Sequence, residues 1–294
     1  MYYFYLFSKT AKYIALISLV ISFFSDLPIF KILCVLVLFD IILDAAVIRC
    51  SFMQIIGLFI INHKYGKNLP SIEDYTNEVS YILPFEGKWM AINGSYEKKY
   101  SHSWDIPTQR YAYDFVILDD NGKSYQGDYQ KCSSYYCYDQ DVLAPADGVV
   151  IKVKNNGKDS LIFPKSRFLV RANHIAGNYI VIRHSEKEYS TLAHLKYGSI
   201  SVKVGETISQ GQCIAKCGNT GNSTEPHLHF QVQTNASFYS SVGLPIHFKD
   251  VEISQVENYE KYESRPHMSA DEILKGYITR GFAYKNKNTA FSVS

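Results

Sequence analysis

The tripeptide His227-Leu228-His229 is the clearest sign of chemistry in this chain. On a β-strand, side chains two residues apart point to the same side, so both imidazoles would face one pocket while Leu228 faces away. Such a pair suits zinc chemistry, because one imidazole can bind the metal while the other contacts the bound water or substrate. The alternative is a surface strand with two exposed histidines. The preceding turn, GNTGNSTEP (218–226), places the start of the strand at a rim, where functional sites often lie.

Asp114 and His194 are further candidates, because each lies in an apolar run that reads as a strand. An unpaired carboxylate among residues such as Phe115 and Val116 would be costly. Either a metal ion or Arg110 could balance the charge of Asp114, and the residues alone leave both readings open. For His194, at the end of YSTLAHL, the alternative to a catalytic role is a histidine that hydrogen-bonds to the backbone.

The elements that must position these side chains are short strands. From about Phe85 the chain alternates apolar and polar residues in runs separated by Gly, Asn, Asp and Pro, which predicts antiparallel β-structure. The strongest runs are 111–118, 148–153, 178–184, 189–195 and 227–233. No convincing helical period occurs between 86 and 240. Further along, 243–248 could be one more strand, and 269–276 predicts a short helix with a Ser N-cap and a Gly stop.

The N-terminal part has a different composition. Residues 1–62 are dominated by Ile, Leu, Val and Phe, in the runs Tyr13–Phe24, Ile29–Ile48 and Ser51–Ile61. Because a membrane-spanning helix needs about 20 apolar residues, we expect two or three transmembrane helices here. The alternative is a buried helical hairpin of a soluble protein. A signal peptide is less favoured, because no small-x-small cleavage site follows the first run.

Composition excludes several classes of protein. The 294 residues hold 30 Lys and Arg against 28 Asp and Glu, which argues against a nucleic-acid-binding protein, and 47% hydrophobic residues exclude wholesale disorder. Cys132 and Cys137 could form a disulfide, whereas Cys213 and Cys217 would lie about 13 Å apart on a strand, too far to pair. Neither spacing is C-x2-C, so a four-cysteine zinc site is not expected.

Several stretches together resemble one family. They are VLAPADGVVIKV, GNYIVIRH, YSTLAHL, VKVGETISQGQCIAKCGNTGNSTEPHLHFQV and, upstream, QRYAYDFVI. These stretches are similar to the lysostaphin-type zinc metallopeptidases, peptidoglycan endopeptidases with the duplicated hybrid motif fold. The block from GNTG to HLHF, with the AHL element, is far more specific than HxH alone. The resemblance covers 143–233 and the upstream stretch, roughly half of the chain, and implies a mainly β catalytic domain, an antiparallel β-sandwich of the hybrid-motif type.

The resemblance also implies the roles of individual residues. The zinc-binding Asp of the family falls on Asp114, and the zinc-binding second His of HxH falls on His229. The first His of HxH, a catalytic residue in the family, falls on His227, and the other catalytic His falls on His194.

The third zinc ligand departs from the usual pattern. Many members write His-x-x-x-Asp, which would put the ligand at Arg110, and Arg cannot bind a metal because it stays protonated. SHSWDIPTQRYAYDF is similar to a subgroup with a His about a dozen residues before the Asp, which implies His102 as the third ligand. The alternative is that His102 is an ordinary loop histidine. The zinc site would then be incomplete, and the domain would be a non-catalytic binding module.

We therefore expect a membrane-anchored zinc metalloendopeptidase that cuts stem or cross-bridge peptides of peptidoglycan. Its partners would be these peptides and the lipid bilayer, with no nucleic acid, and the catalytic domain would lie outside the cytoplasm at the cell membrane. The expected divisions are an anchor (1–62), a linker (63–85), the peptidase domain (86–250) and a C-terminal extension (251–294). The oligomeric state is left open.

Three other functions compete with this expectation. An inactive family member could act as a regulatory or cell-wall-binding module, although such relatives commonly lack several of the site residues. A biotinyl or lipoyl carrier would need a modifiable Lys beside Met between its hairpin halves, and none occurs here. A sugar-phosphotransferase domain would lack the HLHF block.

Overall fold

The computed structural model describes residues 14, 17–18, 20–25, 27–162 and 174–287, and of 30–47 the backbone alone. Its contacts divide the chain into two units, 1–52 and 53–294. The helices are α2 (Pro28–Tyr65) and α3 (Tyr259–Tyr262). The strands are β1 (Trp89–Asn93), β2 (Tyr113–Val116), β3 (Asp141–Leu143), β4 (Gly148–Lys154), β5 (Tyr179–Arg183), β6 (Tyr189–Ala193), β7 (Thr207–Ile208), β8 (Cys213–Lys216), β9 (Leu228–Gln233), β10 (Gly243–Leu244), β11 (Val251–Gln255) and β12 (Phe282–Asn286).

Two of the three apolar runs predicted as separate helices lie in one helix, and before it the described residues 14, 17–18 and 20–22 are also helical. Helix α2 runs without interruption through the predicted runs Ile29–Ile48 and Ser51–Ile61. Pro28 begins this helix, where its missing N–H costs nothing because the first turn has no intrahelical acceptor for it. The run Tyr13–Phe24 lies partly outside the described residues.

The predicted transmembrane helices are not supported by the structure. Among the residues that the structure describes, no helix is both long enough and apolar enough to span a bilayer.

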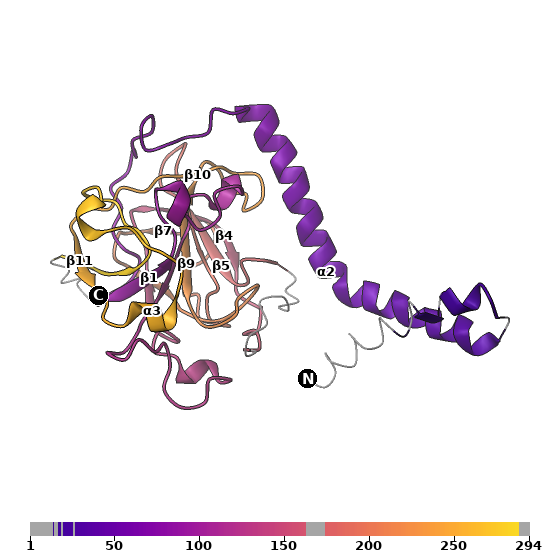
Figure 1. Cartoon of the computed structure of the whole chain (residues 1–294). Helices are drawn as coiled ribbons and strands as arrows, with labels where there is room; N and C mark the ends of the chain where they lie inside the picture. Colours follow the sequence, from indigo (N-terminus) through magenta and orange to yellow (C-terminus); the bar gives the residue numbers. More distant parts are fainter. Residues whose placement is uncertain (1–13, 15–16, 19, 26, 163–173, 288–294) are drawn as a thin grey trace. The chain divides into compact units, whose positions relative to one another are not determined.

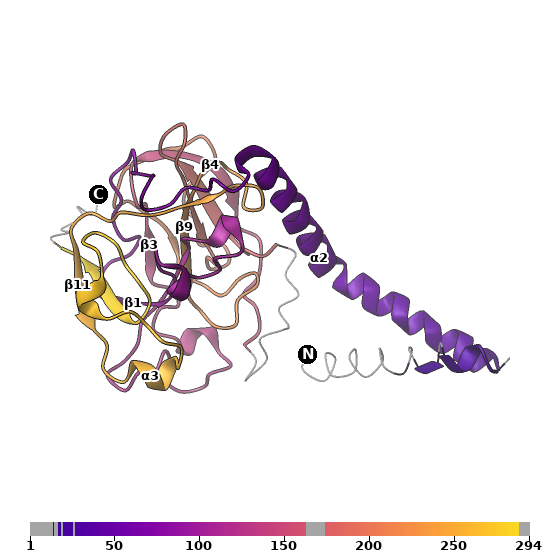
Figure 2. The ribbon, with the colours of Figure 1, turned by 45° about the horizontal axis from the view of Figure 1, so that its top comes forward.

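The prediction of a mainly β, antiparallel fold is confirmed. A 10-stranded sheet has the order β11-β12-β1-β2-β9-β6-β5-β4-β7, with β10 also paired to β9, and β3 and β8 form a 2-stranded sheet. Figures 1 and 2 show the yellow C-terminal strands beside β1 in both views. Each of the five predicted runs contains a strand of this larger sheet, namely β2, β4, β5, β6 and β9.

The core explains why β9 can carry polar side chains on one face. Leu228, Phe230 and Val232 alternate along β9 and are fully buried in the main hydrophobic cluster. Because side chains of a strand alternate between faces, His229 and Gln231 point to the opposite side. Both of these polar residues are also buried, so their hydrogen bonds must be made within the protein.

Two predicted elements are shorter than expected. The strand predicted over 243–248 is limited to Gly243–Leu244, because Pro245 cannot donate to a ladder. The helix predicted over 269–276 is only a 3-10 turn, Ala270–Glu272, although the capping box is present. The N–H of Leu274 donates to the Tyr96 hydroxyl at 3.0 Å and not to a helical carbonyl, so the helix ends there.

The disulfide between Cys132 and Cys137 that the sequence allowed is not formed in the structure. The buried thiol of Cys137 instead donates to the carbonyl of Pro226, at 3.1 Å. Cys137 therefore packs against the turn that precedes β9.

Candidate metal centre

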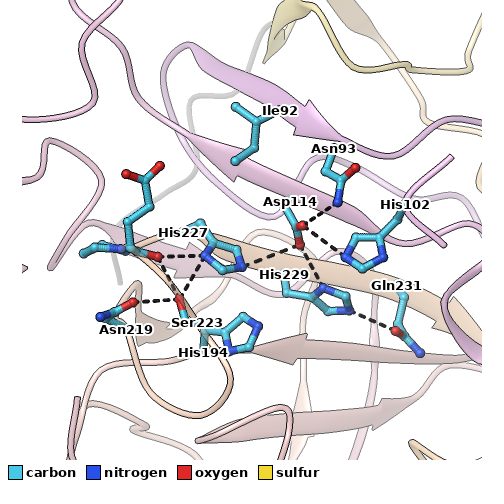
Figure 3. Close-up of polar contacts among 12 residues, drawn as sticks. Ile92, Asn93, His102, Asp114, His194, Asn219, Ser223, His227, His229 and Gln231 are labelled. Atoms are coloured by element: carbon cyan, nitrogen blue, oxygen red, sulfur yellow. Dashed lines mark hydrogen bonds and ion pairs between the residues drawn. The ribbon is translucent and has the colours of Figure 1, made fainter. Parts of the chain in front are cut away.

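Adjacent strands place Asp114 beside His229. Strand β2 pairs with β9 so that Asp114 lies directly opposite His229, and directly opposed side chains share one face of a sheet. Asp114 Oδ1 lies 2.9 Å from His229 Nδ1. His102 approaches from the loop between two 3-10 turns, with its Nε2 3.1 Å from Asp114 Oδ2. Figure 3 shows both imidazoles pointing at the carboxylate.

These three side chains could hold a metal ion. Their candidate ligand atoms all lie within 4.8 Å of one another. Two imidazole nitrogens and one carboxylate oxygen are a donor set that zinc accepts, and three protein ligands leave the fourth position free, as catalytic zinc sites require. The structure thus brings together the three residues that the family resemblance implied as metal ligands, including His102.

Arg110 does not balance the charge of Asp114. Its guanidinium lies over the ring of Trp104, 4.5 Å from the centroid, and its Nε donates to the Trp104 carbonyl. The alternative partner that the sequence left open for Asp114 is therefore engaged elsewhere.

His194 and His227 lie side by side next to this group, with ring centroids 4.5 Å apart (Figure 3). His194 Nδ1 lies 2.8 Å from the carbonyl of Thr220, and His227 Nδ1 lies 2.8 Å from the carbonyl of Glu225. A carbonyl only accepts hydrogen bonds, so Nδ1 is the protonated nitrogen of each ring and Nε2 carries the lone pair. His227 Nε2 lies 3.7 Å from Asp114 Oδ1, at the edge of the metal group.

The backbone of His194 is in an unusual conformation. Its φ is +60°, the left-handed region that a residue with a Cβ rarely adopts. Such strain persists only where the surrounding structure holds it, and it is concentrated at functional sites. Here the bond from Nδ1 to Thr220 and the burial of the ring hold His194 in place.

Burial and the neighbouring charges determine the protonation states of Asp114 and His194. Burial raises the pKa of Asp114, but the imidazoles of His102 and His227 and the hydrogen bonds from His102 and His229 outweigh it, so the pKa lies well below its ordinary value. Burial holds the pKa of His194 well below its ordinary value, helped by the neighbouring imidazoles of His227 and His229. At neutral pH the site therefore contains an ionised carboxylate and a neutral His194.

His229 responds in the opposite direction. Burial lowers the pKa of His229, but the hydrogen bond to Asp114 and the charge of Asp114 raise it by more, so the pKa lies above its ordinary value. A metal ion at this position therefore competes with a proton for Nδ1, as is general for imidazole ligands.

Sequence analysis missed two residues that support the metal group. Gln231 Oε1 lies 2.9 Å from His229 Nε2, and Asn93 Nδ2 donates to Asp114 Oδ2 at 3.1 Å. Gln231 could have been found, because it follows His229 by two residues and must share its face of β9. No local signal marks Asn93, which reaches the site through an irregularity in β1.

Known proteins are similar to this chain over the residues that carry His194, His227 and His229. Residues 134–240, less than half of the chain, match the family model of Peptidase family M23. An uncharacterized metalloprotease of Haemophilus influenzae is 37% identical over 94 residues, which are 32% of this chain and 16% of that protein. The peptidoglycan DD-endopeptidase ShyA of Vibrio cholerae is 42% identical over 91 residues, 31% of this chain and 17% of that protein. The chain thus spans less than a fifth of the length of these relatives.

A solved structure adds little to this match. The catalytic domain of lysostaphin from Staphylococcus simulans is 20% identical, with 54% of this chain and 88% of that chain covered and a TM-score of 0.31. A TM-score this low does not establish a common fold, so the assignment rests on the family match. The matched residues carry His194, His227 and His229 and exclude His102 and Asp114. Residues 134–240 are therefore a domain of Peptidase family M23.

Proposed function

We propose that this chain is a zinc metallopeptidase that hydrolyses peptide bonds of peptidoglycan. One observation carries the proposal: the ligand atoms of His102, Asp114 and His229 converge within 4.8 Å, beside two further imidazoles. The family match supports peptidase chemistry, and the similarity to an enzyme named as a peptidoglycan DD-endopeptidase supports the substrate class. Stem or cross-bridge peptides are the proposed targets.

The chain's own residues would divide the work of hydrolysis. When bound, zinc would polarise the scissile carbonyl and lower the pKa of a water molecule. His194 is neutral with its Nε2 lone pair available, so it can take a proton from the attacking water. Because the Nδ1 hydrogen of His227 is held by the Glu225 carbonyl, only Nε2 could donate to the oxygen on which charge develops, and the ring must be protonated on both nitrogens to do so.

The decisive experiment measures zinc content and release of peptides from purified peptidoglycan, both on the full chain. We expect Asp114→Ala and His229→Ala to lose zinc and activity. His194→Ala and His227→Ala should keep zinc and lose activity. The matched control is His63→Ala, which changes an exposed histidine of α2 and should alter neither measurement. Circular dichroism checks that each variant is folded.

Two outcomes would contradict the proposal. If the wild-type chain holds no zinc under zinc-replete conditions, the hypothesis that it is a zinc enzyme is wrong. Zinc-loaded chain that binds peptidoglycan but releases no peptide would instead support an inactive wall-binding module.

We also propose that the chain is held at the cell membrane with its peptidase domain outside the cytoplasm. Peptidoglycan lies outside the cytoplasm, and the apolar composition of residues 1–62 supports attachment to a bilayer. Protease added to whole cells should cleave the peptidase domain, and the chain should sediment with membranes. Protection from protease until the cells are lysed would contradict this location.

A further inference from the structure

Residues just after α3, well outside the family match, contact a residue that supports the metal group. Arg265 Nη1 donates to Asn93 Oδ1, and its Nη2 donates to the carbonyl of Ile92, both at 3.3 Å. Glu263 forms an ion pair with the same guanidinium, with Oε2 2.8 Å from Nη2. Asn93 in turn donates to Asp114, so a continuous chain of contacts runs from Arg265 to the carboxylate.

The contact with Arg265 fixes which way the Asn93 amide points. A guanidinium can only donate hydrogen bonds, so the oxygen of the amide must face Arg265. The NH₂ group is then directed at Asp114 Oδ2, 3.1 Å away (Figure 3). With the amide reversed, two donors would face each other and Asn93 would present an oxygen to a carboxylate.

An irregularity in β1 creates the position that Arg265 occupies. Ala91 pairs with Phe115 and Asn93 with Asp114, so Ile92 is an extra residue without a partner in the β1–β2 ladder. Such bulges redirect side chains and are frequent next to active sites. The carbonyl of Ile92, freed from the ladder, accepts from Arg265.

Tyr262, the last residue of α3, contacts the residue that supports His227. The hydroxyl of Tyr262 donates to the carboxylate of Glu225, and the backbone carbonyl of Glu225 accepts from His227 Nδ1. Arg265 and Tyr262 therefore contact the immediate supports of Asp114 and His227, respectively.

We propose that Arg265 is a positioning residue for the metal centre, acting through Asn93 to orient the Asp114 carboxylate. This inference rests on the proposed zinc function. Hydrogen bonds to a ligating carboxylate fix its rotation, and removing such supports typically weakens metal binding by about 10–100-fold. Arg265 does not touch the metal group itself, so its effect must pass through Asn93.

The test is the zinc affinity of the full chain, measured by competition with a chelator, for Arg265→Gln, Asn93→Ala and the double variant. We expect each single variant to bind zinc about 10–100-fold more weakly. The double variant should bind no more weakly than Asn93→Ala alone, because Arg265 has nothing to orient once the amide is gone. The matched control, Arg183→Gln, changes an exposed arginine of β5 and should leave zinc affinity unchanged.

A spectroscopic measurement separates positioning from general loss of stability. With Co²⁺ in place of zinc, the visible absorption spectrum reports the ligand geometry, and we expect Arg265→Gln and Asn93→Ala to change it in the same way. If Arg265→Gln does not fold, Arg265→Lys decides, because it keeps the positive charge but lacks the planar fork that donates to both Asn93 Oδ1 and the Ile92 carbonyl.

The outcomes distinguish this inference from the proposed function. If wild-type chain binds zinc and Arg265→Gln binds it equally tightly with an unchanged Co²⁺ spectrum, Arg265 is no positioning residue and the proposed function stands. If the effects of the two variants add in the double variant, Arg265 acts by another route. If wild-type chain binds no zinc, the proposed function itself fails.

Discussion

Histidines 194, 227 and 229 each donate a hydrogen bond from one ring nitrogen to an acceptor of the protein. For His194 and His227 the acceptors are backbone carbonyls, and for His229 the acceptor is the side-chain oxygen of Gln231. Gln231 donates through Nε2 to the carbonyl of Thr108 at 3.0 Å, which fixes its own orientation. When Nδ1 loses its hydrogen, as metal binding requires, the His229 ring therefore keeps its hydrogen on Nε2 and carries its lone pair on Nδ1.

We predict that Gln231→Leu lowers zinc affinity by about 10–100-fold, the usual effect of losing the acceptor that orients a metal-binding imidazole. Gln231→Glu should bind zinc more tightly than Gln231→Leu, because a carboxylate also accepts from Nε2. Chelator competition measures both affinities. Equal affinities for the two variants would show that the acceptor on Nε2 does not matter.

At the scale of elements, the sequence predicted the strands better than the helices. The period-2 alternation is local, so it located β2, β4, β5, β6 and β9 and the shared face of His227 and His229. The helix predicted over 269–276 depended on local caps, but its backbone donor is taken by the hydroxyl of Tyr96, far away in the sequence. Arg265 and Asn93 could not be predicted, because a bulge and a long-range contact leave no periodic signal.

The segment before β1 is fastened to the sheet by one buried carboxylate. The oxygens of Glu188 accept hydrogen bonds from Tyr75, Asn77, Glu78, Val79 and Tyr81. Burial, together with hydrogen bonding to Glu188 and its charge, raises the pKa of the Tyr75 and Tyr81 hydroxyls, so they stay protonated and can donate. This carboxylate orders a segment more than a hundred residues away in the sequence.

We predict that Glu188→Ala lowers the free energy of unfolding by at least about 2 kcal/mol, because it leaves the buried Tyr81 hydroxyl and four partly buried donors without their acceptor. Urea unfolding measures the change, and hydrogen exchange should show faster exchange at the Glu78 and Val79 amides. Glu186→Ala is the control, because Glu186 lies at an exposed position of the β5–β6 hairpin, which also carries Glu188. An equal loss of stability in both variants would argue against this role for Glu188.

The same hairpin predicts a pH dependence of stability. His184 Nδ1 donates to the carbonyl of Asp147 and Nε2 accepts from Ser190, both at 2.7 Å, so the neutral ring satisfies both contacts. Burial lowers the pKa of His184 in the folded chain, against the opposing effect of the Asp147 carbonyl. On acidification the unfolded chain therefore takes up its proton first, and stability is lost as the pH falls below about 6.5.

We predict that the melting temperature of the wild-type chain falls more steeply between about pH 7.5 and about pH 5.5 than that of His184→Gln. Thermal melting in buffers across this range gives the two slopes. His63→Gln, at an exposed position of α2, should keep the wild-type slope. Parallel slopes for wild-type and His184→Gln would exclude a contribution from His184.

At the scale of the whole molecule, the metal centre is assembled from parts on both sides of the family match. His102 and Asp114 precede residues 134–240, while β11 and β12 follow them. Strand β12 pairs with β1, and β1 pairs with β2, which carries Asp114. The C-terminal strands thus belong to the same sheet as Asp114 in β2 and His229 in β9.

This arrangement predicts that a chain ending at residue 250 neither folds cooperatively nor binds zinc. Truncation removes Phe282 and Tyr284 from the buried cluster and leaves β1 as an unpaired edge, and such edges are prone to aggregate. A chain ending at residue 287 keeps every described strand and serves as the control. Thermal melting by circular dichroism and zinc content measure the difference. A cooperative, zinc-binding chain of 250 residues would mean that the sheet is complete without β12, and Arg265 could then not be needed to orient Asp114.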